Sequence, residues 1–346
     1  MIINKTLTRW YSVNKRDLPW RRTTNPYFIW LSEIILQQTK VDQGLPYYEA
    51  FVTNFPTIFR LAEAEEEEVL KLWQGLGYYS RARNLHATAK HIVNALNGKF
   101  PDNYKDLIKL KGVGDYTASA IASICFNEVC AVVDGNVYRA FSRYFGISTP
   151  INSTQGQKEF KILAQKLINK EDPATFNQAI MEFGARQCKP KNPDCTICPL
   201  QNSCVALQKN LITALPVKKK SLKPKKKHFN FLVFVSREGD TILEKREGKG
   251  IWQNLFQFPL IESEQSMTFN SMTAQLKNHD LTRDTIFNLS LYNEEEIIHK
   301  LSHQHLYTKF WIIEIDRLAL KGISINEIKK YPVPILVSNF IDAFNF

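Results

Sequence analysis

The segment "LIKLKGVGDYTASAIASICF", residues 107–126, has the form of a helix, a short Gly-Val-Gly turn and a second helix. Glycines at 112 and 114 let the backbone turn tightly and approach another backbone closely. The free amides of the turn and of the following helix start attract anions. We interpret the segment as a helix-hairpin-helix clamp in which Gly112 and Gly114 contact DNA phosphate. For this motif alone, a structural helix–glycine–helix turn is the alternative.

Around this segment the chain reads mostly as helices up to residue 207. Apolar residues recur at spacings of three and four, which is typical of amphipathic helices, in "PYFIWLSEIILQQ" (26–38), "EEEEVLKLWQGL" (65–76) and "RNLHATAKHIVNAL" (83–96). The segment "LPVKKKSLKPKKKH" (215–228) has the composition of a basic linker. Beyond it, "FNFLVFVS" (229–236) and "TKFWIIEI" (308–315) are β-branched and aromatic runs that predict strands. An all-α body, a basic tether and an α+β domain are expected.

Charge is unevenly spread along the 346 residues, whose net charge is +11. From residue 229 onward there are 12 Lys and Arg and 15 Asp and Glu, which leaves residues 1–228 with a net charge of +14. A basic body favours binding to nucleic acid, with a purely solubilising role as the alternative. The N-terminus lacks an apolar signal segment, and no run approaches the length of a membrane span. We expect a cytoplasmic, nucleoid-associated protein with no membrane partner.

Four of the six cysteines lie in "CKPKNPDCTICPLQNSC", residues 188–204. Disulfides are disfavoured because cytoplasmic thiols stay reduced. Zinc and iron–sulfur both use cysteine ligands, but paired zinc knuckles usually repeat a CxxC unit. Here a single CxxC is flanked by arms of six and five residues, an arrangement that leaves both metals open. Cys125 and Cys130 lie among apolar residues and are expected to be inert core thiols.

Two carboxyl groups are candidates for catalysis. Glu33 lies in "YFIWLSEIILQQT" (27–39), where a helix would surround it mostly with large apolar side chains. Such surroundings raise a carboxyl pKa, as a general acid at neutral pH requires, although a solvated helix face is the alternative. Asp134 follows an apolar run at the start of a predicted helix, where an acid is most often simply an N-cap.

Taken together, the motifs from Leu18 to Cys204 resemble the endonuclease III superfamily, and specifically the MutY family of adenine DNA glycosylases. The motifs occur in this order: "LPWR" (18–21), "SEIILQQT" (32–39), "WQGLGYYSRARNL" (73–85), "GVGDYTASAI" (112–121), "VVDGNVYRAFSR" (132–143), "NQAIMEFGA" (177–185) and the cysteine segment. The resemblance implies a multi-domain fold, with an all-α helix-hairpin-helix glycosylase body, an iron–sulfur cluster loop and a C-terminal α+β Nudix-like domain. Each part has expected bounds: residues 1–20 with 128–208 form the cluster domain, 21–127 a six-helix barrel, 209–228 the linker and 229–346 the Nudix-like domain.

The resemblance implies a chemistry as well. Family members flip adenine out of the duplex before cleaving its glycosidic bond. Glu33 matches the acid that protonates adenine N7, and Asp134 matches the carboxylate that stabilises the oxocarbenium-like sugar. Tyr116 and Asn136 match their orienting partners. Because Tyr116 occupies the position of the Schiff-base lysine in bifunctional members, the resemblance implies a monofunctional glycosylase.

The remaining expected sites follow from the same resemblance. The adenine pocket matches Trp20, Arg21, Leu36 and Glu182. Further DNA contacts match Gln38, Tyr78, Lys189 and Lys191. One 4Fe–4S cluster is expected on Cys188, Cys195, Cys198 and Cys204. We expect a monomer that acts on double-stranded DNA with adenine opposite 8-oxoguanine or guanine.

Residues 229–346 resemble the Nudix-like domain of the same family. The metal-binding G-x5-E-x7-RE-x2-EE box is absent from this segment, which disfavours hydrolysis of oxidised nucleotides. In "IHKLSHQHLYTKFW" (298–311), Leu301, Ser302 and His303 match the loop that reads 8-oxoguanine, with Leu301 where relatives often have Phe. A serine hydroxyl can both donate and accept, which suits the N7–H and O8 groups of that base. A bifunctional lyase and a non-catalytic DNA-binding or iron–sulfur protein are the rival functions.

Overall fold

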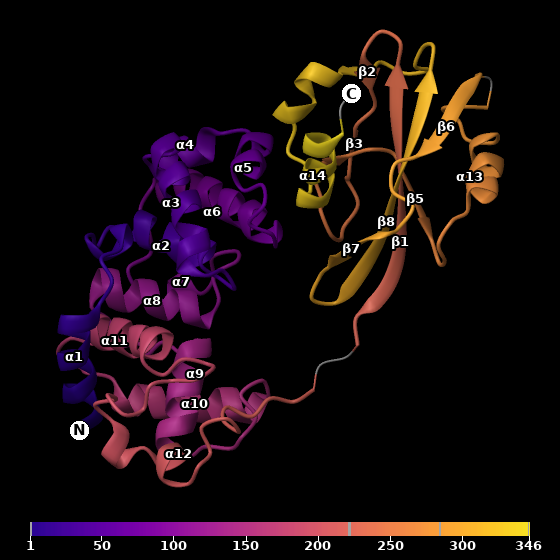
Figure 1. The fold of residues 1–346 in the computed structure, drawn as a ribbon. Coiled ribbons are helices and arrows are strands. Elements are labelled where there is room, and N and C mark those ends of the chain that lie inside the picture. The colour runs from indigo at the N-terminus through magenta and orange to yellow at the C-terminus, as the bar shows by residue number, and fades with distance from the viewer. Residues whose placement is uncertain (1, 221–222, 284, 345) are drawn as a thin grey trace. The chain divides into compact units, whose positions relative to one another are not determined.

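A computed structural model describes residues 2–220, 223–283, 285–344 and 346. Contacts within the chain divide it into two units, residues 1–63 with 84–220 and residues 64–83 with 221–346. Figure 1 shows helices through the N-terminal part of the chain and a sheet in the C-terminal part. Residues 221 and 222 of the expected linker lie outside the described residues. The division of the helical body into a cluster domain and a barrel stays a prediction.

The first unit is built from helices, as the spacing of apolar residues predicts. They are α1 (Ile2–Asn14), η1 (Pro19–Arg21), α2 (Pro26–Ile35), α3 (Val41–Asn54), α4 (Ile58–Glu63), α6 (Ser80–Leu96, which begins in the second unit), α7 (Tyr104–Leu107), α8 (Asp115–Phe126), α9 (Gly135–Phe145), α10 (Thr154–Leu167), α11 (Pro173–Arg186), η2 (Gln201–Ser203) and α12 (Val205–Gln208). The sequence pattern predicts a helix that includes Gln37, but α2 ends at Ile35.

Helix α11 lies at the centre of one half of this unit. It packs against α1, α8 and α9, and Figure 1 shows α1 alongside it. Phe176, Ile180 and Phe183 on α11 are almost fully buried in a core that also takes Leu7 of α1 and Phe141 of α9. Since burial of large apolar side chains dominates folding stability, this core holds α1, α9 and α11 together.

The second unit contains a mixed sheet. Its strands are β1 (Lys225–Ser236), β2 (Asp240–Thr241), β3 (Glu244–Lys245), β4 (Phe256–Gln257), β5 (Leu260–Ser263), β6 (Phe287–Leu291), β7 (Ile297–Lys300), β8 (Gln304–Ile315) and β9 (Ile323–Ser324), with helices α5 (Glu66–Leu72), α13 (Phe269–Leu276), η3 (Ile325–Lys330) and α14 (Ile335–Ala343). The main sheet has the order β5-β1-β8-β6, and β7 also pairs with β8. Strands β1 and β8 are parallel, and the other pairs in this sheet are antiparallel.

Both faces of the sheet are covered, which explains the continuous apolar run in β1. On one face, Leu232 and Phe234 pack with Met272 of α13. On the other, Phe310 of β8 stacks on Phe340 of α14 at 4.1 Å between ring centroids. Strands buried on both faces lose the alternation of apolar and polar residues. The predicted α+β domain is confirmed, with strands at both quoted runs.

The basic segment between the units is anchored at both ends. The Val217 carbonyl accepts a hydrogen bond from the Ile151 amide at 3.0 Å, and the Lys219 amide donates to Asn152 Oδ1 at 2.7 Å. From Lys225 onward the chain is already strand β1. Among the described residues, no helix is both long and apolar enough to cross a membrane.

Candidate active site

Glu33 occupies a buried position on α2. The helix starts cleanly because the Asn25 side chain caps the Tyr27 amide at 3.0 Å and a proline follows at the first helical position. The Glu33 side chain is left 8% exposed. Burial raises its pKa from the ordinary 4.5 to about 7, opposed by a hydrogen bond from Tyr116 and reinforced by the charge of Asp134. The carboxyl group is therefore substantially protonated at neutral pH.

Tyr116 stands at the start of α8, directly after the glycine turn. Gly112 has φ +78, and a Cβ there would lie 2.8 Å from Asn84, so this position requires glycine. A Cβ on Gly114 would meet nothing within 4 Å, and the residue is exposed. The Tyr116 hydroxyl lies 3.2 Å from Met181 Sδ, a weaker acceptor for its single proton than the Glu33 carboxylate, and burial raises the pKa of this phenol well above its ordinary value. Tyr116 is thus a neutral hydrogen-bonding group beside Glu33.

Asp134 caps α9. Its Oδ1 accepts from the amides of Asn136 at 2.9 Å and Val137 at 2.8 Å, and its Oδ2 accepts from Asn136 Nδ2 at 2.7 Å. Burial raises the pKa of Asp134, while these three donors favour the ionised carboxylate. The positive end of α9 acts in the same direction. The N-cap that the sequence indicates is present, and it orients a carboxylate whose charge acts on Glu33.

A buried arginine links Asp134 to the cysteine loop. Arg139 donates to Asn136 Oδ1 at 2.8 Å, to the Gly184 carbonyl at 2.6 Å and to the Cys188 carbonyl at 2.7 Å. A Cβ on Gly184 would lie 2.6 Å from Asn136, so glycine permits the close approach of α9 and α11. Arg139 was not among the residues that the sequence singled out, although it lies inside the quoted motif 132–143.

Three of the four residues expected in the adenine pocket lie beside the entry to α2 or on α11. Glu182 is 1% exposed and pairs with Arg21 at 2.7 Å and with Arg16 at 2.7 Å. Burial alone would raise its pKa, but the hydrogen bonds from Arg16 and Arg21 lower it to about 2. Arg21 also acts on Glu33, whose pKa it lowers. Trp20 instead packs edge-on against Tyr48 at 5.0 Å.

Tyr116, Asp134 and Arg21 thus all act on the pKa of Glu33, and Arg21 is paired with Glu182 at 2.7 Å. Leu36 is the C-cap of α2. Arg16 is a site residue that the sequence reasoning missed, because no local pattern marks a side chain that reaches across 166 positions to Glu182.

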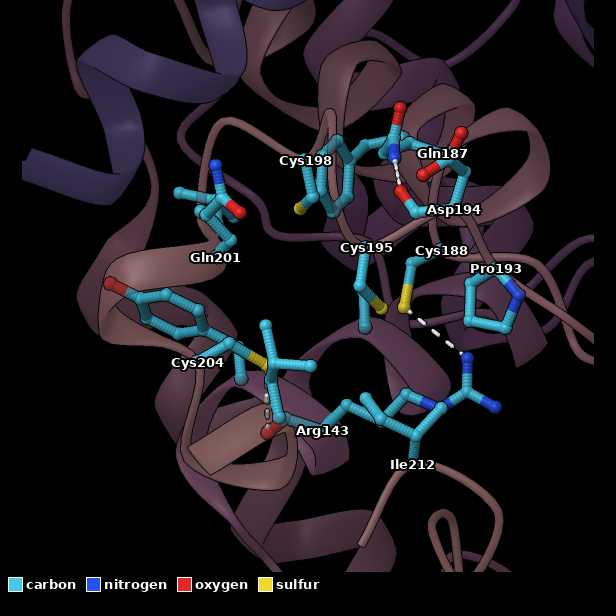
Figure 2. A pocket seen from close by; sticks show the side chains of 15 residues that line it. Arg143, Gln187, Cys188, Pro193, Asp194, Cys195, Cys198, Gln201, Cys204 and Ile212 are labelled. Atoms are coloured by element: carbon cyan, nitrogen blue, oxygen red, sulfur yellow. Dashed lines mark hydrogen bonds between the residues drawn. The ribbon is translucent and has the colours of Figure 1, made fainter. Parts of the chain in front are cut away.

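The four cysteines of the segment 188–204 line one cavity, which Figure 2 shows from close by. Arg143 is 2% exposed and lies against them, donating to Cys188 Sγ at 3.5 Å and to the Lys189 carbonyl at 2.7 Å. Among the described residues, no group of three or more His, Cys, Asp and Glu side chains converges closely enough to hold a single metal ion. Lys189 and Lys191 are exposed on the arm between the first two cysteines.

Gln38 and Tyr78 share an unusual backbone conformation. Their φ angles are 56 and 49, in the left-handed region that side chains other than glycine rarely adopt. Tyr78 is also 49% exposed, which is uncommon for a large aromatic side chain. Strain of this kind concentrates at functional sites, so it agrees with the expected DNA contacts without assigning them.

A cavity of about 560 Å³ lies in the second unit. Its lining includes Tyr78, Trp252, His299, Ser302 and His303. The Ser302 hydroxyl is 3.4 Å from His303 Nδ1, and both side chains are exposed at the tip of the β7–β8 hairpin. Leu301 also lines the cavity. Trp252, with φ 58 and its ring 5.8 Å from that of His299, was missed because its signal is the backbone angle, which sequence does not show.

Comparisons with known proteins match both parts of the chain. Residues 31–170 match the family described as HhH-GPD superfamily base excision DNA repair protein, and residues 230–343 match the NUDIX domain family. A solved thermostable thymine-DNA glycosylase is 30% identical with a TM-score of 0.56, covering 60% of this chain and 96% of its own. An endonuclease III in a non-covalent DNA complex shares the fold at 22% identity and a TM-score of 0.53, covering 61% of this chain and 95% of its own.

Curated relatives extend the match over most of the chain. The adenine DNA glycosylase of Buchnera aphidicola subsp. Baizongia pistaciae is 38% identical, covering 92% of this chain and 88% of its own. That of Arabidopsis thaliana is 33% identical, covering 90% of this chain and 57% of its own. That of Homo sapiens is 44% identical over 59% of this chain and 39% of its own.

The helical fold with its hairpin defines a DNA glycosylase class, the helix-hairpin-helix superfamily of base excision repair, here joined to a Nudix-like domain. Within that class, the chain belongs to the adenine DNA glycosylase family, the MutY family, whose members are hydrolases of N-glycosyl bonds. The expected family and fold class are confirmed.

Proposed function

We propose that this chain excises adenine mispaired with 8-oxoguanine or guanine in duplex DNA, by hydrolysing the N-glycosyl bond without cutting the strand. The observation that carries the proposal is the buried Glu33 carboxyl, whose pKa of about 7 is set by burial, Tyr116 and Asp134. The similarity to adenine DNA glycosylases over 92% of the chain supports adenine as the base. The helix-hairpin-helix fold, shared with an endonuclease solved with DNA, supports a DNA partner.

In the proposed reaction, adenine is flipped out of the stack and Glu33 donates its proton to adenine N7. The C1′–N9 bond then breaks, its electron pair leaves with the base, and the base departs as neutral adenine. A protonated donor is needed at neutral pH, and a carboxyl with a pKa of about 7 supplies it. Arg21 and Glu182, paired at 2.7 Å, are proposed to border the adenine pocket with Trp20 and Leu36.

Asp134 is proposed to stabilise the positive charge that develops on the sugar. Its two oxygens are held by three hydrogen bonds at the start of α9, so the charge is oriented before the reaction begins. Asn136 supplies two of these donors and takes a hydrogen bond from Arg139, which makes it an orienting residue. Water then adds to C1′ and loses a proton, which the Glu33 carboxylate left by the first step can accept, and an abasic site results.

Tyr116 decides between hydrolysis and strand cleavage. Bifunctional relatives need an amine at this position, and a phenol cannot form an imine with the sugar. The phenol is neutral and hydrogen-bonded to Glu33 in this structure. We therefore propose a monofunctional glycosylase.

The pH dependence of excision should report the bond between Tyr116 and Glu33. This bond lowers the pKa of Glu33, so Tyr116→Phe should raise that pKa. Because the protonated acid is active, the rate should fall as pH rises through about 7 in the wild type, and this limb should move to higher pH in the variant. The measurement is single-turnover excision from pH 5 to pH 9, with Tyr144→Phe as control. A limb that stays in place would show that another group is the acid.

The cysteine loop is proposed to hold one 4Fe–4S cluster. Four thiols around one cavity are the donor set for such a group. The buried Arg143 offsets the negative charge that thiolates would bring. When bound, the cluster would supply rigidity to the arm that carries Lys189 and Lys191, which we propose contact DNA phosphate with Gly112 and Gly114.

The cluster proposal predicts a coloured protein. The purified chain should be yellow-brown and contain about four iron atoms, as expected for a cluster held by four thiolates. Cys198→Ser should reduce the iron content and the colour together. Metal analysis with absorption spectroscopy makes the measurement, and Cys125→Ser is the control because Cys125 does not line the cavity. A colourless wild type with one zinc ion per chain would contradict the proposal.

The hairpin tip at Leu301, Ser302 and His303 is proposed to read 8-oxoguanine, with Gln38 and Tyr78 filling the stack around the lesion. The cavity beside this tip has a volume of about 560 Å³ and combines aromatic rings with exposed hydrogen-bonding groups. Such a lining suits a planar base that must be recognised by donors and acceptors. This tip lies in the unit that does not contain Glu33, so reading and chemistry can be separated by mutation.

Mutation of the hairpin tip should therefore change the preference for 8-oxoguanine over guanine without abolishing excision of adenine. Ser302→Ala with His303→Ala should reduce the preference for 8-oxoguanine over guanine by roughly ten- to hundredfold, since lost hydrogen bonds of this kind cost about 1–3 kcal/mol. The measurement is single-turnover excision of adenine opposite 8-oxoguanine, guanine and thymine. The control is Ser266→Ala, an exposed serine of the same unit. Equal slowing on the first two duplexes would assign the tip a purely structural role.

A further inference from the structure

Basic side chains from three neighbouring strands form a row beside the hairpin tip. In the register of the sheet, Lys300 of β7 pairs with His305 of β8, and His305 pairs with Lys226 of β1. Residues paired across adjacent strands point to the same face of a sheet. Figure 1 shows β7 and the starts of β1 and β8 at the same end of the sheet. Lys226, His305 and Lys300 therefore make a single line of cationic and potentially cationic groups, called here the basic row.

The basic row is open to a ligand. Lys226 and Lys300 are both exposed, and His305 is partly exposed. Within the described parts of the chain, no carboxylate forms an ion pair with either lysine. The next lysine of β1 differs, since Lys227 points to the other face and pairs with Glu262 at 2.8 Å. The side chain of an exposed lysine is usually mobile. Here the backbone positions of all three residues are fixed by the pairing of adjacent strands.

Two aromatic contacts and one carboxylate contact lie next to Lys226 in the row. The Lys226 ammonium lies 5.5 Å from the Tyr307 ring centroid, which attracts a cation. Tyr307 stacks on His228 at 5.2 Å, and His228 in turn takes the carboxylate of Glu296 at 2.8 Å. The carboxylate is thus engaged with His228, and the two lysine charges remain available for an external anion.

We propose that the basic row binds backbone phosphates of duplex DNA beside the base that the hairpin tip reads. This inference rests on the proposed function, because the tip at Ser302 and His303 defines which stretch of DNA lies there. Lys226 and Lys300 are two strand spacings apart, about 10 Å, and their flexible side chains can reach neighbouring phosphates of one strand. Phosphate contacts position a protein on DNA and carry no sequence information. The row would thus set how deeply, and in which direction, the hairpin tip enters the DNA.

The lysine-rich segment thereby divides into parts with different tasks. Lys219 is held at its backbone by Asn152, and Lys225 begins β1 by donating its amide to the His303 carbonyl at 3.0 Å. The carbonyl that Lys225 engages belongs to the tip itself. The start of β1 is therefore hydrogen-bonded to the hairpin tip through the backbone, and the lysines at this start of the strand lie beside the tip.

The test measures how binding depends on salt. Each phosphate contact makes the slope of log K against log[salt] steeper by about 0.9, so Lys226→Gln with Lys300→Gln should make it shallower by about 2. The full-length protein is titrated with an undamaged duplex and with one containing adenine opposite 8-oxoguanine. The loss should be the same on both duplexes. The matched control, Lys227→Gln with Lys330→Gln, removes the same charge from lysines already paired with Glu262 and Glu327.

Each outcome decides the proposal. A shallower slope in the test variant alone supports it, and Lys226→Arg with Lys300→Arg should restore the wild-type slope. Equal changes of slope in the test and control variants would show that only net charge matters, and this would overturn the proposal. An unchanged slope in the test variant would overturn it as well. Because an undamaged duplex is used in parallel, this result does not depend on excision. A wild type that binds DNA but releases no adenine would contradict the proposed function and leave the slope comparison intact.

Discussion

Glu33→Gln should lower single-turnover excision of adenine opposite 8-oxoguanine by about 10²–10⁴-fold, the contribution usual for a general acid. The amide keeps the size of the carboxyl but cannot transfer a proton to N7. Binding to the same duplex should be nearly unchanged, because the binding surface is intact. Glu49→Gln, an exposed substitution on α3, is the matched control and should excise normally. Residual excision within tenfold of wild type would assign the acid elsewhere.

The same variant should also be more stable at alkaline pH. A carboxyl whose pKa is raised from 4.5 to about 7 on folding binds more protons in the folded state, so stability falls as pH rises between these values. Above pH 7 the cost is about 3 kcal/mol, at roughly 1.4 kcal/mol for each pKa unit. Glu33→Gln removes this cost. Urea unfolding at pH 5 and pH 8 should show the variant gaining on the wild type at the higher pH. The same difference in stability between variant and wild type at both pH values would mean that Glu33 is ionised in the folded state.

Asp134→Asn should have an effect of similar size for a different reason. It removes the negative charge that faces the developing positive sugar, and electrostatic groups of this kind contribute about 10²–10³-fold. One oxygen remains to cap α9, but the new amide opposes Asn136 Nδ2, which donates at 2.7 Å in the wild type. Excision should fall by at least that factor while the protein stays folded.

Capping and charge must be separated for this variant. Asp172 caps α11 in the same way, accepting from the Thr175 amide at 3.0 Å, so Asp172→Asn is the matched control. It should lose at most about 1 kcal/mol of stability and retain excision. If both variants lose stability and activity to the same extent, Asp134 acts as a cap alone.

Local patterns predicted the parts of the site that depend on short spacings. The glycine turn, the acid before α9 and the cysteine segment are each readable within twenty residues, and the structure places a helix start or a shared cavity at each of them. Glu33 was predictable as a buried carboxyl with a raised pKa because its helical neighbours are apolar, and burial is the largest cause of the shift to about 7. The opposing hydrogen bond from Tyr116 and the added charge of Asp134 were not predictable, because both residues approach from other helices.

Long-range contacts account for what the sequence left out. Arg139 joins Asn136, Gly184 and Cys188 only because α9 and α11 pack closely. Lysines have low strand propensity, so the start of β1 at Lys225 was read as linker. Pairing with β8 overrides that propensity and produces the basic row. The left-handed backbone of Trp252 likewise depends on tertiary context.

Strand scission distinguishes a glycosylase that only hydrolyses the N-glycosyl bond of adenine from one that also has lyase activity. A duplex with adenine opposite 8-oxoguanine is incubated with wild-type protein, with and without borohydride, and half of each sample is then heated in alkali. A monofunctional glycosylase should give strand breakage at the adenine position only after alkali, and no covalent adduct with borohydride. Breakage before alkali or a trapped adduct would contradict the assignment of Tyr116, and an adenine site that survives alkali would contradict the proposed function itself.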